Sequence, residues 1–135
     1  GLEESLVGIT KFCVHPEHLK KEKVIVGGTK NVHFEKIKAL KPDIILCNKE
    51  ENTKAMIQEL AGIAMVHVSD IYTIDDTLDL IHFYGALFQK EEAAQALVKE
   101  ISNQKLEFED FIKNKPTRSV AYFIWKEPWK KIRRA

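Results

Sequence analysis

The sequence contains few side chains with the spacing that catalysis or metal binding requires. His15 and His18 lie three residues apart, close enough to share one metal ion, and this spacing alone leaves a histidine metal site open. His33, His67 and His82 are expected to pack locally or to face solvent. The sequence carries neither a GxSxG nor an HExxH motif, so it predicts no catalytic residues. The histidine spacing is too weak a signal to assign metal ligands, so no resident metal ion is predicted.

A glycine pair in the stretch Val26-Gly-Gly-Thr-Lys30 precedes an expected helix, as a phosphate-binding loop would. The stretch matches neither GxxxxGK[ST] nor GxGxxG, the patterns that place backbone N–H groups around a phosphate. A tight turn before a helix is therefore the favoured interpretation. A nucleotide-binding enzyme domain of doubly wound type remains the alternative.

The two cysteines, Cys13 and Cys47, are too few for a disulfide scaffold and too widely spaced for a zinc knuckle. Both are expected to be half-buried thiols at strand ends, since cysteine is among the most buried residue types. Whether they pair in a disulfide is left open by the sequence, because pairing depends on their separation in space.

The composition is that of a globular domain, with 135 residues, 44% apolar and 30% charged. A net charge of +1 gives the chain no nucleic-acid footprint. No apolar run approaches the length of a membrane span. The first residues, Gly1-Leu2-Glu3-Glu4, lack the basic start and apolar stretch of a signal peptide.

One stretch, Asn31–Cys47, indicates how the elements are arranged. Asn31 is expected to cap a short helix whose apolar residues recur every third position, at Phe34, Ile37 and Leu40. Pro42 ends the helix and is expected to hold Lys41 in an extended conformation. The following residues, Ile44–Cys47, form an unbroken apolar strand of the kind that is covered on both faces in a parallel sheet.

The rest of the chain repeats this alternation of strand and helix. Asn48 with Glu51 is expected to cap a helix running to about Leu60, which Gly62 would close in a left-handed conformation. Thr73 with Asp76 is expected to cap another helix. Further strands are predicted at 6–10, 24–26, 64–68 and 119–124, and one long helix at 91–114. The predicted fold is α/β, with a doubly wound parallel-sheet lobe and a long helix leading to another strand.

Ligands of open α/β sheets bind at the carboxyl ends of the strands, where aromatic and polar residues gather in this sequence. Such loops without a catalytic grouping suit binding rather than turnover. Local packing explains Tyr72 and the tryptophans equally well. The candidate ligand-binding residues are Lys11, Phe12, Cys13, Thr29, Lys30, Asn48, Lys49, Tyr72, Trp125 and Trp129.

Several of these stretches together resemble a known family. They are Val7-Gly-Ile-Thr10 with Pro16 soon after, Val26-Gly-Gly28, and Asn31-x-x-x-Glu35-x-Ile37-x-x-Leu40-Lys-Pro-Asp43-Ile-Ile45. This pattern is similar to the N-terminal lobe of the cobalamin, haem and iron-siderophore binding proteins of ABC importers. In that family two α/β lobes are joined by a rigid backbone helix, which Glu91–Asn114 resembles. Ser119–Trp129 resembles the opening strand and cleft loop of the second lobe.

The resemblance implies a periplasmic or extracytoplasmic protein, with a lipid anchor as an option for the full-length form. It implies no intrinsic cofactor, because the metal chelate is the transported ligand. It also implies a permease partner, which the family contacts through a surface glutamate on each lobe. Glu35 occupies that place in the N-terminal motif.

The sequence departs from the family pattern at both ends. The strand and helix that precede Leu6 in the family are absent, as is most of the second lobe, so a truncated chain with one cleft wall is expected. The predicted organisation is an N-terminal lobe at 1–90, an inter-lobe helix at 91–115 and the start of a second lobe at 116–135. Thr29 stands where cobalamin binders place an aromatic residue, which weakens the cobalamin interpretation. A non-binding fragment that associates through exposed strand edges is a further alternative.

Overall fold

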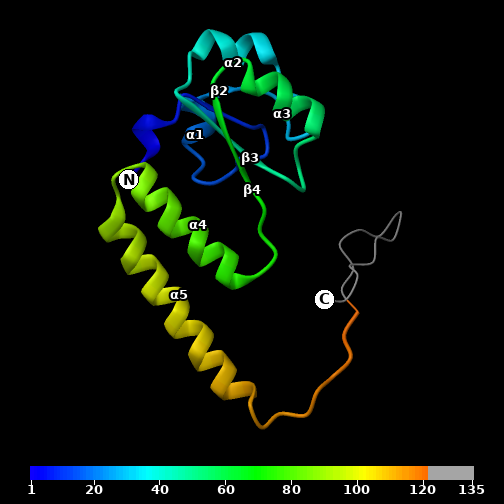
Figure 1. Ribbon diagram of the computed structural model, residues 1–135, viewed down its shortest axis with the longest axis vertical. Coiled ribbons are helices and arrows are strands. Elements are labelled where there is room, and N and C mark those ends of the chain that lie inside the picture. The colour runs from blue at the N-terminus through cyan, green and yellow to red at the C-terminus, as the bar shows by residue number, and fades with distance from the viewer. Residues whose placement is uncertain (122–135) are drawn as a thin grey trace. The chain divides into compact units, whose positions relative to one another are not determined.

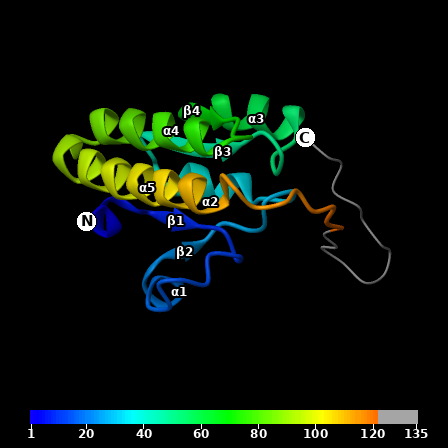
Figure 2. The same ribbon diagram turned by 90° about the horizontal axis from the view of Figure 1, so that it is seen from below.

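The structure is a computed structural model that describes residues 1–121. The chain divides into two compact units, Gly1–Phe83 and Tyr84–Ala135. Figures 1 and 2 show the elements in chain order. They are a 3-10 turn η1 (Glu3–Ser5), β1 (Gly8–Ile9), α1 (Leu19–Glu22), β2 (Val24–Ile25), α2 (Phe34–Leu40), β3 (Ile44–Asn48), α3 (Lys54–Ala61), β4 (Met65–Ser69), α4 (Ile74–Leu87) and α5 (Glu91–Ile112).

The strands of the first unit are all parallel to their partners, which confirms the predicted α/β class. β1 pairs with β2, Gly8 lying opposite Val24. β3 pairs with β4 over their full lengths, from Ile44 opposite Met65 to Asn48 opposite Ser69. In the described residues the hydrogen bonds join the strands in two separate pairs, whereas the sequence predicted one sheet.

The turn between β2 and α2 explains why the helix begins later than predicted. Gly27 has a φ of 117°, and a Cβ there would lie 2.6 Å from the carbonyl oxygen of Asn31, so only glycine fits this close approach. The N–H of Gly28 donates to that same carbonyl at 2.7 Å. Asn31 thus belongs to the turn, and the prediction that it caps α2 is wrong. His33 holds the cap position, and its side chain makes no capping bond.

The end of α2 also differs from the prediction. Lys41 is left-handed, with φ 48° and ψ 55°, rather than extended. Its N–H donates to the carbonyl of Lys38, so a left-handed turn closes the helix before Pro42.

The loop that follows β3 also differs from the prediction. The side-chain oxygen of Asn48 accepts from the N–H groups of Glu50 and Glu51 at 2.9 and 3.3 Å, and so organises a turn instead of capping a helix. Thr53 caps α3 by accepting from the N–H of Met56 at 3.3 Å. Gly62 ends this helix in a right-handed conformation, with φ −76°, rather than in the expected left-handed one.

The predicted cap of α4 is confirmed in both directions. The N–H of Asp76 donates to Oγ1 of Thr73 at 3.0 Å, and the N–H of Thr73 donates to Oδ2 of Asp76 at 2.8 Å. This reciprocal pair satisfies N–H groups that the first helical turn leaves without partners.

The core of the first unit lies between β3 and the two helices that flank it in sequence. Its buried members are Ile37 of α2, Cys47 of β3, and Met56 and Leu60 of α3. Cys47 is a free thiol, as is Cys13, and burial raises the pKa of the Cys47 thiol. Leu46 points to the opposite face of β3 from Cys47 and is 45% exposed. The sequence predicted that both faces of this strand are covered, but only the face that carries Cys47 is buried in the core.

The second unit contains the last turn of α4 and the long helix α5. This helix begins at Glu91, as the sequence predicted. Gly85 and Ala94 are both buried, and the N–H of Lys90 donates to the carbonyl of Gly85 at 2.7 Å. Within the predicted strand at 119–124, residues 119–121 form no regular strand, and the remainder lies outside the described residues. No helix in the described part of the chain is both long and apolar enough to span a membrane.

Candidate functional site

The loops after β1 and β2 meet at the carboxyl ends of those strands. The N–H of Lys11 donates to the carbonyl of Gly27 at 2.8 Å. A Cβ on Gly28 would lie 3.3 Å from both the Lys11 side chain and the Phe12 ring, so the two loops pack closely. Phe12 is 60% exposed, and Nζ of Lys11 lies 5.1 Å from the centre of its ring. This pair therefore presents an aromatic face and a cation to solvent.

The loop after β2 is joined to the loop after β3 by side-chain hydrogen bonds. Oγ1 of Thr29 donates to Oε2 of Glu51 at 2.9 Å, and Nζ of Lys30 donates to the carbonyl of Glu50 at 3.2 Å. Nδ2 of Asn52 donates to the carbonyl of Thr29 at 2.7 Å. These bonds connect the end of one strand pair to the end of the other.

The ends of β3 and β4 are held together by both backbone and side-chain bonds. The N–H of Lys49 donates to the carbonyl of Ser69 at 2.9 Å, and Nδ2 of Asn48 donates to Oγ of Ser69 at 3.4 Å. The ammonium of Lys49 forms an ion pair with the carboxylate of Asp70. Nζ of Lys49 also lies 5.9 Å from the centre of the Tyr72 ring, which is 70% exposed.

These four strand-end loops form one continuous edge of the first unit, which we call the rim. It is defined by Lys11, Phe12, Gly28, Thr29, Lys30, Asn48, Lys49, Ser69, Asp70 and Tyr72. The hydrogen bond with Lys49 lowers the pKa of the Asp70 carboxyl, and the same bond raises the pKa of Lys49. Both groups are therefore charged at neutral pH.

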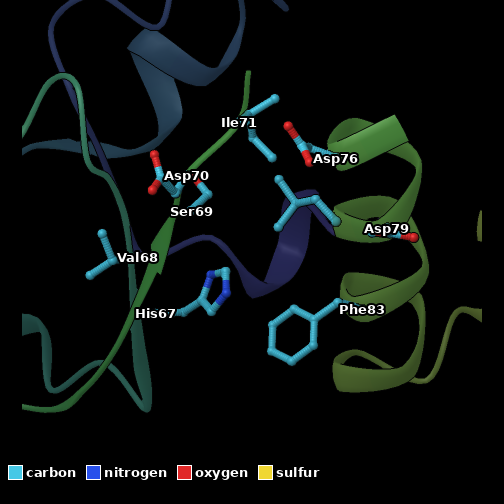
Figure 3. Close-up of a pocket in the computed structure, with 9 residues that line it drawn as sticks. His67, Val68, Ser69, Asp70, Ile71, Asp76, Asp79 and Phe83 are labelled. Atoms are coloured by element: carbon cyan, nitrogen blue, oxygen red, sulfur yellow. The ribbon is translucent and has the colours of Figure 1, made fainter. Parts of the chain in front are cut away.

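A shallow hollow adjoins the rim between β4 and α4, as Figure 3 shows. It is open to solvent, measures about 280 Å³, and includes Ser69, Asp70 and Ile71 of the rim's last loop. The His67 and Phe83 rings stack along it with centres 4.6 Å apart, from β4 and α4 respectively. Next to the polar rim, the hollow adds an aromatic wall.

The structure brings together most of the ligand-binding residues predicted from the sequence. The rim includes Lys11, Phe12, Thr29, Lys30, Asn48, Lys49 and Tyr72. Cys13 is half-buried, and its thiol donates within its own loop to the carbonyl of His15 at 3.7 Å. Trp125 and Trp129 lie outside the described residues.

Gly28, Ser69 and Asp70 also belong to the rim, although they are not among the predicted ligand-binding residues. Asp70 follows a predicted strand, so its position was a usable signal. The sequence predicts Glu51 and Asn52 inside a helix, whereas α3 begins only at Lys54. This boundary error hides the bonds that both side chains make to Thr29.

No group of three or more His, Cys, Asp or Glu side chains within residues 1–121 is placed to hold a metal ion. Of the predicted histidine pair, His18 lies 3.7 Å from the carboxylate of Glu3. His67 packs against Phe83, as expected from the sequence. Glu35 lies in the first turn of α2 and is exposed, as its position off the apolar face predicted.

The chain is similar in sequence to proteins of one known family. Residues 1–131 match the family described as periplasmic binding protein. An uncharacterized ABC transporter substrate-binding lipoprotein of Bacillus subtilis is 32% identical over 108 residues, which are 76% of this chain and 33% of the relative. A vitamin B12-binding protein of Pectobacterium atrosepticum is 32% identical over 105 residues, 77% of this chain and 37% of the relative.

A solved structure shows the same fold. The siderophore-binding protein BauB, bound to two acinetobactin molecules and ferric iron, superposes with a TM-score of 0.71 at 28% identity, covering 87% of this chain and 45% of that one. The chain thus spans about a third of the length of the curated relatives it matches.

Proposed function

We propose, from the premise that this chain belongs to the periplasmic binding protein family, that it is part of the substrate-binding component of an ABC importer. It would act by binding a solute and presenting it to a permease rather than by catalysis. The observation that carries this proposal is the rim, where four loops from two strand pairs meet at the sheet end that binds ligands in open α/β folds.

The relatives and the polar groups of the rim support a proposal for the class of ligand. One relative is named for vitamin B12 and one solved neighbour holds a ferric siderophore, so a metal chelate is the proposed ligand, carried as cargo. Haem is the third metal chelate bound by the family that the sequence resembles. The hydroxyl of Thr29 is bonded to Glu51, and no aromatic side chain stands at that position. The polar amides and ammonium groups of the rim therefore favour an oxygen-rich ferric chelate over a corrinoid.

An extracytoplasmic location is proposed on the same grounds. The Bacillus subtilis relative is named as a lipoprotein, and the family is named for the periplasm. The proposed protein partner is the importer's permease. Glu35 is the proposed contact on this lobe, since it is exposed in the first turn of α2.

Site-resolved NMR of the isotopically labelled chain tests the ligand proposal. Three probes would be titrated: cyanocobalamin, haemin with gallium in place of iron, and the gallium complex of acinetobactin, because diamagnetic gallium preserves the spectra. We expect the gallium acinetobactin complex to shift amides of the rim, at Phe12, Thr29, Lys49 and Tyr72. Amides of α5, such as that of Leu106, serve as the internal control. If no probe shifts the rim amides at millimolar concentration, the proposed function is wrong.

A further inference from the structure

Asn52 occupies a connecting position in the first unit. Its side chain is half-buried, and it comes from the turn between β3 and α3 rather than from a strand end. Its amide oxygen accepts from the N–H of Asn48, the last residue of β3, at 2.7 Å. Its amide nitrogen donates to the carbonyl of Thr29, in the loop after β2, at 2.7 Å.

The two ends of this amide are matched to different partners. The oxygen faces an N–H donor and the nitrogen faces a carbonyl acceptor, so the reversed orientation would set like against like. The amide nitrogen also lies 3.6 Å from Sδ of the buried Met56, and the backbone N–H of Asn52 donates to the carbonyl of Asn48 at 2.8 Å. The side chain is thus anchored to the core and to its own turn while it reaches the other strand pair.

Two other side-chain hydrogen bonds join the loop after β2 to the loop after β3, and both are more exposed than the Asn52 bond. Those from Thr29 to Glu51 and from Lys30 to the carbonyl of Glu50 involve exposed groups. Water competes with exposed polar contacts, so they fix geometry less strongly than a half-buried bond does. Among the bonds of this junction in residues 1–121, the Asn52 contact is therefore the one best placed to set the spacing of the two loops.

We propose that Asn52 is a positioning residue, which holds the loop at 27–31 and the loop at 48–52 at the spacing that a ligand on the rim requires. Thr29 and Lys30 lie on one side of this clamp, and Asn48 and Lys49 lie on the other. A rim that is already at its bound spacing loses less conformational entropy when ligand arrives. The ligand part of this inference rests on the proposed function, whereas the clamp itself does not.

Two substitutions separate the two bonds of the clamp. Asn52→Asp keeps an acceptor for the N–H of Asn48 and removes the donor to Thr29, while Asn52→Ala removes both. Asn103→Asp makes the same chemical change at an exposed position of α5 and is the matched control. Amide hydrogen exchange would be followed at Gly28, which reports the loop after β2, and at Asn48, which reports the end of β3.

We expect exchange at Gly28 to be about fivefold faster in both Asn52 variants, since a hydrogen bond contributes about 1 kcal/mol. Exchange at Asn48 should rise in Asn52→Ala and stay close to the parent rate in Asn52→Asp. Asn103→Asp should change neither. Unchanged exchange at Gly28 in both Asn52 variants would overturn the clamp, and so would a uniform increase across the whole first unit.

Affinity for the gallium acinetobactin complex completes the test. Weakening of about fivefold in both Asn52 variants supports a positioning role. A parent affinity retained by loops that exchange faster would reduce Asn52 to a structural residue and refute the proposal. If the parent chain binds no probe while the exchange pattern holds, the clamp stands and the proposed function fails.

Discussion

Asp70 and Lys49 show how one ion pair sets the charge at the end of two parallel strands. The hydrogen bond from Lys49 lowers the pKa of Asp70, so the contribution of the pair to stability is complete above the ordinary aspartate value of about 3.9. It is lost as pH falls through the lowered pKa of the folded protein. The pKa of Lys49 is raised, so the contribution is lost again only as pH rises above the ordinary lysine range.

Replacing Lys49 by methionine tests this assignment, because methionine keeps a long side chain and removes the charge. The titration midpoint of Asp70, followed by carboxyl carbon NMR, should move upward in Lys49→Met. Asp76 is the control within the same spectra, since backbone N–H groups of Tyr72 and Thr73 lower its pKa. Equal Asp70 midpoints in the two proteins would show that Lys49 does not hold the carboxylate.

Glu35 gives a second prediction for a single residue. Because it is exposed and proposed to contact a permease, Glu35→Lys should reduce uptake of the ligand by cells at least tenfold while ligand affinity and stability stay unchanged. Uptake of radiolabelled iron as its siderophore complex measures the effect. Glu59→Lys, an exposed position on α3, is the matched control. Normal uptake with Glu35→Lys would remove Glu35 from the docking surface.

At the scale of elements, the helix caps show where sequence patterns hold and where they fail. Thr73 and Asp76 were predicted correctly, because a reciprocal cap needs only residues three positions apart. Asn31 and Asn48 also look like caps in the sequence. In the structure Asn31 lies in the turn after β2, and Asn48 bonds to Asn52 and to its own turn, so more distant contacts decide their roles.

The contact between α4 and α5 in the second unit depends on a small residue. A Cβ placed on Gly85 would lie 2.4 Å from Cβ of Ala94, far inside normal contact distance. Glycine to alanine in a helix usually stabilises by about 1 kcal/mol, but overpacking here should cost about 1–3 kcal/mol. We therefore expect Gly85→Ala to destabilise the chain.

Guanidinium denaturation followed by circular dichroism measures that loss. The double variant Gly85→Ala with Ala94→Gly moves the methyl group to the other helix and should recover part of the lost stability. A stabilising effect of Gly85→Ala alone would show that the two helices adjust to the added methyl.

At the scale of the whole molecule, stability of the first unit depends on a small core. Leu60 is 2% exposed and packs with Ile37, Cys47 and Met56. Leu60→Ala should lower the free energy of unfolding by about 2–5 kcal/mol, as expected for a buried leucine. Leu106 of α5 is 63% exposed, so Leu106→Ala should cost little. Urea denaturation of both variants makes the comparison, and equal losses would contradict the assignment of this core.

The predicted boundaries at 1–90, 91–115 and 116–135, and association through strand edges, stay predictions at this scale. The chain spans 45% of the BauB chain whose fold it shares.

The sequence by itself determined the α/β class, the long helix from Glu91, the cap at Thr73, and most of the strand ends that carry the rim. Local periodicity, capping and apolar runs depend on residues close in the chain, so they can be read without the fold. The tertiary structure decided the division of the strands into two pairs, the ion pair of Lys49 with Asp70, and the bridge from Asn52 to Thr29. Those features join residues distant in sequence, and their partners are set only when the strand ends meet in space.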